Sequence, residues 1–192
     1  MIPRKIMNPS IINGIYAITP DWRDTDLLIK KTEEVLTAGV NVVQYRNKIA
    51  TNDQKLSQAK EIKALCNNFK TPLIINDDIE LCRILDADGV HLGENDDSLE
   101  KARLILGPSK IIGVSCYTSI DRVKKAVDKG ATYIALGACF PTITKPNAPT
   151  ASLDLIALVL KKFKIPVVAI GGIDLENVKL LVKAGVKCVA II

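Results

Sequence analysis

The feature that most constrains the fold is a short phrase that recurs along the chain. A glycine is followed within a few residues by a β-branched or aromatic run in TAGVNVV, DADGVHL, DKGATYI and KAGVKCV. Each copy follows a longer amphipathic segment, so the glycine stands where a helix ends and the run stands where a strand begins. The phrase therefore predicts a repeated strand–helix unit with a period of roughly 20–30 residues.

The spacing of the apolar residues places the individual elements. Short apolar runs predict eight strands, over 14–19, 41–46, 72–77, 89–93, 110–116, 132–140, 166–172 and 188–192. Apolar residues three and four apart predict helices over 26–39, 54–66, 78–86, 97–106, 119–131, 152–163 and 174–184. Eight successive units in one domain favour a closed TIM (β/α)8 barrel over an open doubly wound sheet, which usually has fewer strands.

Two of the predicted helices carry clear signals. In the first, Leu28, Val35 and Leu36 are expected to share the buried face. In the helix over 119–131, Ser119 is expected to cap the N-terminus and Gly130 to end the helix. Both patterns are typical of helices packed on the outside of a sheet.

The barrel is predicted to be a single domain over 14–192, preceded by an N-terminal extension over 1–13. The chain ends on the eighth strand, and a parallel strand without a covering helix would expose apolar surface. We therefore expect a truncated chain that lacks the final helix. The alternatives are that a partner or the N-terminal extension covers this strand.

Composition argues against several classes of protein. The net charge is +5, but basic residues are mixed with acidic ones, which favours a solvated surface over a nucleic-acid interface and still suits anionic small molecules. The 5 cysteines form no C-x-x-C pair and there is 1 histidine, so we expect reduced thiols rather than zinc or disulfides. No apolar run has transmembrane length, and Pro and Asn interrupt the N-terminal segment too often for a signal peptide. We expect a cytoplasmic protein with no membrane partner; whether it is a homo-oligomer is left open.

Polar side chains cluster where the predicted strands end. In a parallel barrel these ends meet on one face, where catalytic residues lie, so we expect the cluster to line one pocket. In strand order, the candidates are Gln44, Arg46 and Lys48; Asn76, Asp77 and Asp78; Glu94, Asn95, Asp96 and Asp97; Ser115; Thr142, Thr144 and Lys145; and Gly171 with Gly172.

The basic and glycine positions suit phosphate groups. Arg46 and Lys48 alternate, so on a continuing strand they would point the same way as a two-cation clamp for a diphosphate. The other interpretation is a solvated strand end. Gly171 and Gly172 would offer backbone N–H groups to a phosphate monoester, or would form a turn chosen for close packing.

The acidic positions also have two interpretations. Carboxylates at the ends of adjacent strands can hold Mg2+ together with substrate phosphates. Alternatively, Asp77 or Asp78 could cap the helix over 78–86, and Asp96 or Asp97 could cap the helix over 97–106.

The sequence offers no convincing general base and no nucleophile. His91 lies within a strand and is expected to line the core or the barrel interior, and Cys116 and Cys139 have no histidine partner in the sequence pattern. Cations, carboxylates and hydroxyls without a base suit a reaction in which a metal-neutralised diphosphate leaves. Positioning and electrostatics would then supply the catalysis.

Several motifs together resemble one known family. QYRNK, INDD, DGVHLGENDD, IGVSCYTS, ALGACFPTITKPNAP and VAIGGI occur in this order, and together they are similar to the thiamine-phosphate synthase family from about residue 14 to the last residue. The resemblance implies a transferase that condenses hydroxymethylpyrimidine diphosphate with thiazole phosphate to give thiamine phosphate and pyrophosphate. It also implies a dissociative reaction with Mg2+ as cofactor, in which a pyrimidine-stabilised carbocation is captured by the thiazole nitrogen.

The resemblance implies roles for individual residues. Asp77 and Asp96 would bind Mg2+, with Asp97 replacing Asp96 if the loop register shifts. The residues expected to be catalytic are Arg46, Lys48, Ser115 and Lys145. The pyrimidine diphosphate would be held by Gln44, Arg46, Lys48, Asn76, Ser115 and Lys145, and the thiazole phosphate by Thr142, Thr144 and the Gly172 backbone. Further substrate-binding positions would be Tyr45, Asn47, Ile143 and Ile192.

The sequence departs from the family at its end. The family's eighth strand continues into a serine and a short helix that help to seat the thiazole phosphate, whereas this chain stops at Ile192. Two alternatives stay open: a thiazole tautomerase of the same superfamily, and a non-catalytic ligand-binding paralogue. The intact QYRNK and PTITK motifs argue against the tautomerase, which has no diphosphate to hold.

Overall fold

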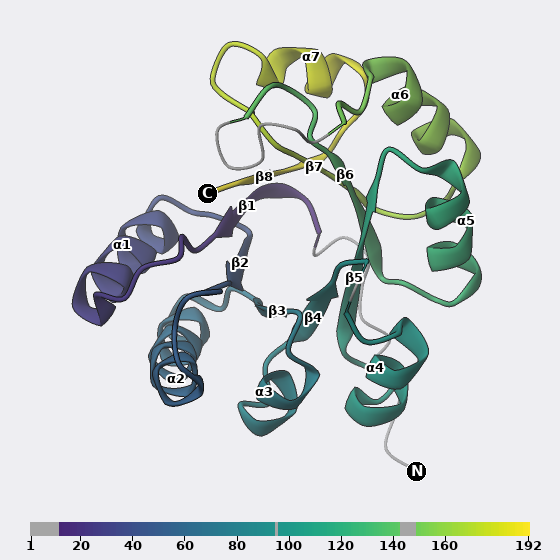
Figure 1. Ribbon diagram of the computed structural model, residues 1–192. Coiled ribbons are helices and arrows are strands. Elements are labelled where there is room, and N and C mark those ends of the chain that lie inside the picture. Colours follow the sequence, from purple (N-terminus) through teal and green to yellow (C-terminus); the bar gives the residue numbers. More distant parts are fainter. Residues whose placement is uncertain (1–11, 95, 143–148) are drawn as a thin grey trace.

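The computed structural model describes residues 12–94, 96–142 and 149–192, which form a closed barrel of eight parallel strands (Figure 1). Each strand pairs with the next one along the chain, and β1 closes the ring by pairing with β8, with Gly14 opposite Cys188. The helices lie around the outside of the ring. The predicted TIM barrel is confirmed, and the open doubly wound sheet is excluded.

The elements alternate strictly along the chain. The strands are β1 (Gly14–Ile18), β2 (Val42–Tyr45), β3 (Leu73–Asn76), β4 (Gly89–Leu92), β5 (Ile111–Tyr117), β6 (Tyr133–Gly137), β7 (Val167–Ile170) and β8 (Cys188–Ile191). The helices are α1 (Thr25–Thr37), α2 (Asn52–Phe69), α3 (Ile79–Ile84), α4 (Leu99–Leu106), α5 (Ile120–Asp128), α6 (Leu153–Lys162) and α7 (Val178–Lys183).

Alternating side chains divide the core into an interior layer and an outer layer. On β3, Leu73 and Ile75 pack outward with helix residues, whereas Ile74 belongs to a cluster supplied by strands and by Ile12 just before β1. This strand-borne cluster fills the barrel interior, as the two-residue period of a β-strand requires. Tyr16 and Tyr133 are its largest fully buried members.

Close strand contacts at the opening of β4 leave no room for a side chain. A Cβ added to Gly89 would overlap the backbone carbonyl and the side chain of Ile111 on β5. Gly89 and Ile111 are paired in the sheet register, and Ile111 is buried. The glycine of the recurring phrase is therefore required at this position for packing. It begins β4, whereas α3 already ends at Ile84, so the expectation that this glycine ends a helix was wrong.

Most of the predicted helix signals are confirmed. Ser119 accepts a hydrogen bond from the N–H of Arg122 and caps α5, and Gly130 follows the helix with φ of 79°. The expectation for α1 was partly wrong, because Val35 is exposed and Thr32 is buried in its place. The Thr32 hydroxyl donates to the carbonyl of Leu28, so its polarity is satisfied within the helix.

An aspartate was expected to cap the N-terminus of α3 and of α4, and the expectation holds only for α3. Asp78 caps α3 by accepting from the N–H of Leu81. Ser98 caps α4, so the expectation that Asp96 or Asp97 caps this helix was wrong. All the predicted strands except the fifth are also shorter than expected; for example, β2 ends at Tyr45 and β6 ends at Gly137.

The outer faces of β8 and β1 are partly open. Within 12–94, 96–142 and 149–192 the helix order ends with α7, and Ile15 and Ile191 are exposed on the adjoining strands. Figure 1 shows α1 and α7 on either side of this pair of strands. Most of the predicted N-terminal extension, residues 1–11, lies outside the described residues.

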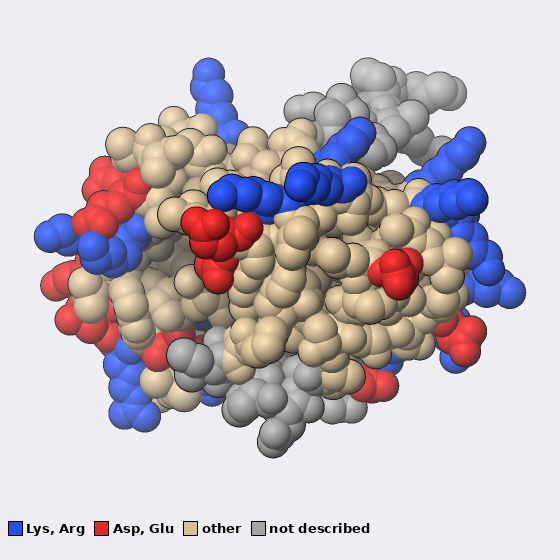
Figure 2. All heavy atoms as spheres, turned by 90° about the horizontal axis from the view of Figure 1, so that it is seen from above, with Lys and Arg blue, Asp and Glu red and all other residues tan. Residues whose placement is uncertain are grey.

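The remaining composition-based expectations concern cysteines, charge and membranes. All the cysteines are free and buried. Basic and acidic side chains are interspersed on the face shown in Figure 2. Among the described residues, no helix is both long and apolar enough to cross a membrane.

Candidate active site

A cavity opens at the carboxyl ends of β2 and β3. Its volume is about 260 Å³, and its lining includes Asn47, Lys48, Asn76 and Asp77. These are residues that the sequence placed at the strand ends. The structure therefore brings the QYRNK and INDD motifs together in one pocket.

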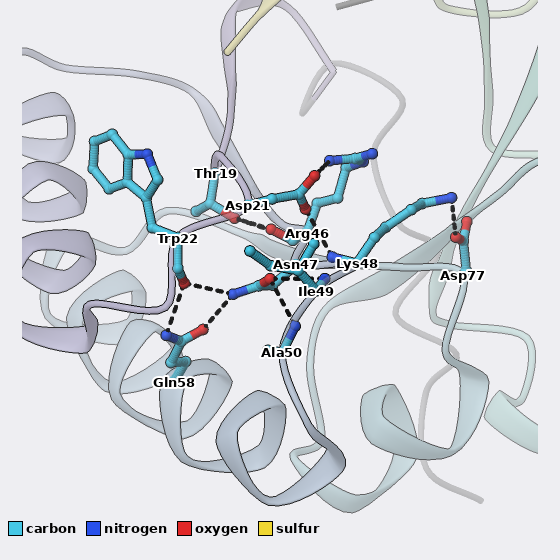
Figure 3. A network of polar contacts seen from close by, with 10 residues as sticks. All are labelled: Thr19, Asp21, Trp22, Arg46, Asn47, Lys48, Ile49, Ala50, Gln58 and Asp77. Carbon is cyan, nitrogen blue, oxygen red and sulfur yellow. Dashed lines mark hydrogen bonds and ion pairs between the residues drawn. The ribbon is translucent and has the colours of Figure 1, made fainter.

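Asp21, in the loop after β1, anchors the loop that follows β2 (Figure 3). Its Oδ2 accepts from Arg46 Nη1 at 2.7 Å, and its Oδ1 accepts from the backbone N–H of Lys48 at 2.7 Å. Thr19 also binds this loop through two hydrogen bonds: its hydroxyl donates to the Arg46 carbonyl at 2.9 Å and accepts from the Arg46 N–H at 2.8 Å. Sequence reasoning missed both residues, although their place after the first strand matched the rule applied to the other strands.

The expectation that Arg46 and Lys48 lie on a continuing strand and point the same way was wrong. β2 ends at Tyr45, so the alternation of a strand does not continue through the two basic residues. Arg46 pairs with Asp21, whereas Lys48 Nζ lies 3.2 Å from Asp77 Oδ2 (Figure 3). The two cations are held by separate carboxylates, one in the loop after β1 and the other after β3, on opposite sides of β2.

Tyr45 and Asn47 also line the cavity, but their polar groups are engaged within the protein. Asn47 Nδ2 donates to the Trp22 carbonyl at 2.7 Å and to Gln58 Oε1 at 3.0 Å (Figure 3). The Tyr45 hydroxyl donates to the same Gln58 oxygen at 2.9 Å. Asn47 Oδ1 also accepts from the next loop N–H groups, at Ile49 and Ala50, so these two predicted binding residues shape the loop.

Asp77 and Asp96 form a pair of neighbouring carboxylates. Burial first, and then the adjacent Asp96 carboxylate, raise the pKa of Asp77, while Lys48 opposes the shift. Asp96 Oδ2 accepts from the N–H of Gly93 at 2.6 Å, which fixes it at the end of β4. Asp97 is instead paired with Lys101 at 2.7 Å on the exposed start of α4, so Asp96 is the acidic neighbour of Asp77.

This pair has the chemistry of a magnesium site. Mg2+ prefers oxygen ligands and is commonly held by one or two carboxylates plus substrate phosphates. The mutual repulsion of Asp77 and Asp96 is relieved in the described part of the chain only partly, by Lys48. No group of three or more His, Cys, Asp or Glu suited to a metal occurs among the residues described, so a metal ion here would take its remaining ligands from substrate or water.

Ser115 and Gln44 are joined through buried side chains in the barrel interior. His91 Nε2 lies 2.8 Å from Ser115 Oγ, and His91 Nδ1 lies 2.9 Å from the Tyr133 hydroxyl. Tyr133 contacts the Tyr16 hydroxyl at 2.8 Å, which accepts from Gln44 Nε2 at 2.8 Å. His91 therefore lines the barrel interior, as one of its two interpretations expected.

The buried titratable groups are poor bases and nucleophiles at neutral pH. Burial lowers the pKa of His91 to about 4. Burial also raises the pKa of the Cys116 thiol to about 12 and that of Cys139 to about 11. These thiols stay protonated, which agrees with the absence of a nucleophile in the sequence pattern.

The opposite side of the face contains the predicted thiazole phosphate residues. Gly171 and Gly172 have φ of 99° and 65°, and a Cβ on Gly172 would overlap the carbonyl oxygens of Pro141 and Phe140. The loops after β6 and β7 therefore touch at this glycine. Thr142 is described at the edge of the same loop, but Ile143, Thr144 and Lys145 lie outside the described residues. Ile192 follows β8 and is exposed.

The arrangement defines a class of protein before any comparison is made. A closed parallel barrel with cations and paired carboxylates at the carboxyl ends of its strands is typical of a TIM-barrel enzyme acting on phosphorylated substrates. Residues 15–192 match the family model of thiamine monophosphate synthase. The chain belongs to this family, and it is a transferase of thiamine biosynthesis.

Curated relatives cover nearly the whole chain. It is 49% identical over 181 residues to the thiamine-phosphate synthase of Methylobacillus flagellatus, covering 94% of this chain and 86% of the relative. It is 45% identical over 179 residues to the thiamine-phosphate synthase of Thiobacillus denitrificans, covering 93% of this chain and 85% of the relative. These relatives favour the synthase over the tautomerase and the non-catalytic paralogue.

Solved structures agree with the sequence relatives. The thiamine phosphate pyrophosphorylase of Pyrococcus furiosus superposes with a TM-score of 0.85 at 32% identity, covering 95% of this chain and 86% of that structure. An N-acetylmannosamine-6-phosphate 2-epimerase of Clostridium perfringens has a TM-score of 0.71 at 14% identity, covering 95% and 88%. The second likeness concerns the barrel fold alone.

Proposed function

We propose that the chain condenses hydroxymethylpyrimidine diphosphate with thiazole phosphate, releasing pyrophosphate in a dissociative reaction that requires Mg2+. The observation that carries the proposal is the carboxylate of Asp77, which lines the cavity after β2 and β3 beside Lys48 and has Asp96 as its acidic neighbour. A site of this kind suits a ligand that is strongly anionic and brings its own oxygen ligands for a divalent cation.

Asp77 and Asp96 would hold the magnesium ion. When bound, Mg2+ would neutralise charge on the departing diphosphate. Lys48 is already within ion-pair distance of Asp77, so its ammonium is placed at the rim of the same site, available to a phosphate oxygen. Asp21 fixes the position of Arg46, which would present the rest of its guanidinium to the diphosphate.

The roles of the remaining residues form part of the same proposal. Ser115 would donate to the pyrimidine diphosphate, and Asn76 would contact it from the cavity wall. Gly172 and Thr142 would bind the thiazole phosphate, because both lie where the loops after β6 and β7 meet and a glycine backbone can offer its N–H to a phosphate. Thr144, Ile143 and Lys145 are proposed from the motif alone.

A dissociative reaction fits a site without a strong base. Departure of pyrophosphate needs stabilised negative charge on the leaving group, which cations supply, and needs no proton to be removed from carbon. The low pKa of His91 and the high pKa values of the buried thiols are compatible with this requirement. A cytoplasmic location and small-molecule substrates, with no nucleic-acid or membrane partner, are also proposed, and a homo-oligomer stays open; the free, buried cysteines support the location.

Pyrophosphate release tests the proposal directly. The purified chain is incubated with both precursors, and pyrophosphate and thiamine phosphate are measured with Mg2+ and after removal of Mg2+ by EDTA. We expect equal amounts of both products with Mg2+, near-complete loss in EDTA, and recovery when Mg2+ is restored.

Other outcomes have clear meanings. Isomerisation of a thiazole phosphate without pyrophosphate release would support the tautomerase. Binding of both precursors without any product in Mg2+ would support the non-catalytic paralogue. Undiminished turnover in EDTA would remove Mg2+ from the proposal.

Replacing Asp21 with asparagine tests how Arg46 is positioned. The variant loses the charge that holds the guanidinium, while the amide can still accept one hydrogen bond. Since hydrogen bonds to charged groups contribute about 1.5–3 kcal/mol, kcat/KM is expected to fall about tenfold, mainly through KM for the diphosphate substrate. Glu34→Gln, which breaks an exposed ion pair with Lys31, is the control. Equal kinetics in the two variants would show that Asp21 does not position Arg46.

A further inference from the structure

Five side chains form a continuous hydrogen-bonded chain across the barrel interior, and we name it the interior chain. In order it consists of Gln44, Tyr16, Tyr133, His91 and Ser115, contributed by five different strands. Each contact is 2.8 or 2.9 Å long. Tyr16 and Tyr133 are 1% and 0% exposed, so water cannot substitute for their partners. The two ends are residues proposed to touch substrate.

Counting hydrogens gives the interior chain a direction. Gln44 Nε2 donates to the Tyr16 hydroxyl. The Tyr16 hydrogen then has Tyr133 as its only acceptor among the described contacts, and the Tyr133 hydrogen in turn goes to His91 Nδ1. A buried hydroxyl whose hydrogen has no acceptor costs about 1–3 kcal/mol, so the order is strongly favoured.

The direction fixes the tautomer of His91. Because Nδ1 accepts from Tyr133, the ring hydrogen lies on Nε2 and is donated to Ser115 Oγ. If His91 carried a hydrogen on Nδ1, as in the imidazolium or the other tautomer, Tyr133 would have to donate to Tyr16, and Tyr16 to the Gln44 amide. The Tyr16 hydrogen would then face Gln44 Nε2, which is itself a donor. The Ser115 hydroxyl, already accepting from His91, keeps its own hydrogen for another partner.

We infer that Tyr16, Tyr133 and His91 are positioning residues that couple the amide orientation of Gln44 to the hydrogen direction of Ser115. This rests on the proposed function, in which Ser115 faces substrate, and on the substrate-binding role that the family resemblance implies for Gln44. With Nε2 of Gln44 held by Tyr16, its carbonyl oxygen is left as an acceptor, and Ser115 is left as a donor. The site is thus set for a ligand with a donor facing Gln44, such as an aromatic amino group, and an acceptor facing Ser115.

Turning the Gln44 amide round would reverse every hydrogen bond in the interior chain. Ser115 would then donate to His91 and would offer only its lone pairs to a ligand. The two ends therefore change polarity together, although they lie on separate strands. A ligand with a carbonyl in place of the amino group would be rejected at Gln44 unless the whole interior chain reversed.

Nitrogen NMR of the imidazole tests the direction without any turnover. The chain has 1 histidine, so 15N-labelled His91 gives a single, assigned pair of ring nitrogens. We expect the wild type at neutral pH to show the neutral tautomer with hydrogen on Nε2. A spectrum of the Nδ1–H tautomer or of the imidazolium would overturn the inference.

Removing one hydroxyl tests the coupling. Tyr16→Phe deprives Gln44 of its acceptor and Tyr133 of its donor, without changing a residue proposed to touch substrate. We expect about a tenfold rise in KM for the pyrimidine diphosphate, a smaller change in kcat, and shifted His91 ring signals. In Tyr133→Phe, where Nδ1 loses its donor, we expect signals of both tautomers.

The control is Thr32→Val, which removes a buried hydroxyl from α1, outside the barrel interior. It should leave KM and the His91 spectrum unchanged. If Tyr16→Phe behaves like Thr32→Val in both measurements, the coupling is refuted. If the wild type makes no thiamine phosphate but its His91 signals respond to Tyr16→Phe as expected, the proposed function fails while the interior chain stands.

Discussion

Replacing Asp77 with asparagine is expected to lower kcat/KM about 100-fold or more and to leave the metal-free fold at least as stable as the wild type. Asparagine keeps the shape of the side chain and one oxygen, but it removes the negative charge that would hold Mg2+ beside Asp96. Metal stabilisation of a leaving group is worth several kcal/mol, and about 1.4 kcal/mol corresponds to a tenfold change in rate. The activity loss is therefore expected to exceed that of any variant of the surrounding loop.

The stability of this variant follows from the sign of the pKa shift. The pKa of Asp77 is raised by burial and by Asp96, so the folded protein binds this proton more tightly than the unfolded chain does. Stability from this group is therefore present below the ordinary pKa of aspartate and is lost as the pH rises through the folded pKa. Asparagine cannot ionise and escapes that loss at neutral pH.

Steady-state kinetics over a range of Mg2+ concentrations, together with urea unfolding at pH 4 and pH 7 in EDTA, measure both effects. The apparent affinity for Mg2+ should fall with the activity. Glu100→Gln is the charge-matched control, because it removes an exposed carboxylate on α4 that pairs with Lys129. It should change neither kcat/KM nor the free energy of unfolding. A variant of Asp77 with less than a threefold change in kcat/KM would place the metal elsewhere.

Replacing Gly89 with alanine is expected to destabilise the fold by at least about 3 kcal/mol. The added methyl group would overlap the carbonyl and side chain of Ile111, which is fixed by its register partner and buried against the barrel interior. Overpacking of a rigid interior usually costs about 1–3 kcal/mol, and contact with backbone rather than with a flexible side-chain end puts this site at the upper limit.

A glycine of a different kind provides the comparison for Gly89. Gly107 has φ of 83° and ψ of 176°, a backbone region essentially restricted to glycine, and a Cβ there would meet nothing within 4 Å, so Gly107→Ala suffers only backbone strain. That strain is on the order of 1–3 kcal/mol. Urea unfolding midpoints should therefore rank the wild type first, Gly107→Ala second and Gly89→Ala last. Equal midpoints for the two variants would show that β4 and β5 can separate to admit a methyl group.

The parts of the fold that depend on local chemistry could be predicted from the sequence. Ser119 and Asp78 cap helices as expected, because a side chain that bonds to its own backbone three residues later needs no distant partner. Hydropathy could not predict that Thr32 rather than Val35 lies on the buried face of α1. The Thr32 hydroxyl is satisfied inside its own helix, so a polar side chain is buried where the pattern suggested solvent.

The site was predictable by position but not by pairing. The strand-end rule found Lys48 and Asp77, because chain order alone places adjacent strand ends together. It could not show that Arg46 turns to Asp21, since that contact depends on where β2 stops and how the next loop bends. Tyr16 and Tyr133 were missed for a related reason: they read as ordinary core residues, and only the closed ring brings their hydroxyls into contact.

The seam between β1 and β8 has a consequence for how the polypeptide reaches its final form. Gly14 meets Cys188 and Ala17 meets Ile191, so the ring closes by joining segments at nearly opposite ends of the chain. The entropy lost in closing a loop grows with its length, and contacts between distant segments slow folding. Every other strand can add to a neighbour already synthesised, whereas this seam must await residues 188–191. A nascent chain on the ribosome would therefore hold an open sheet with two bare edges, the state most exposed to wrong strand pairing and chaperone capture.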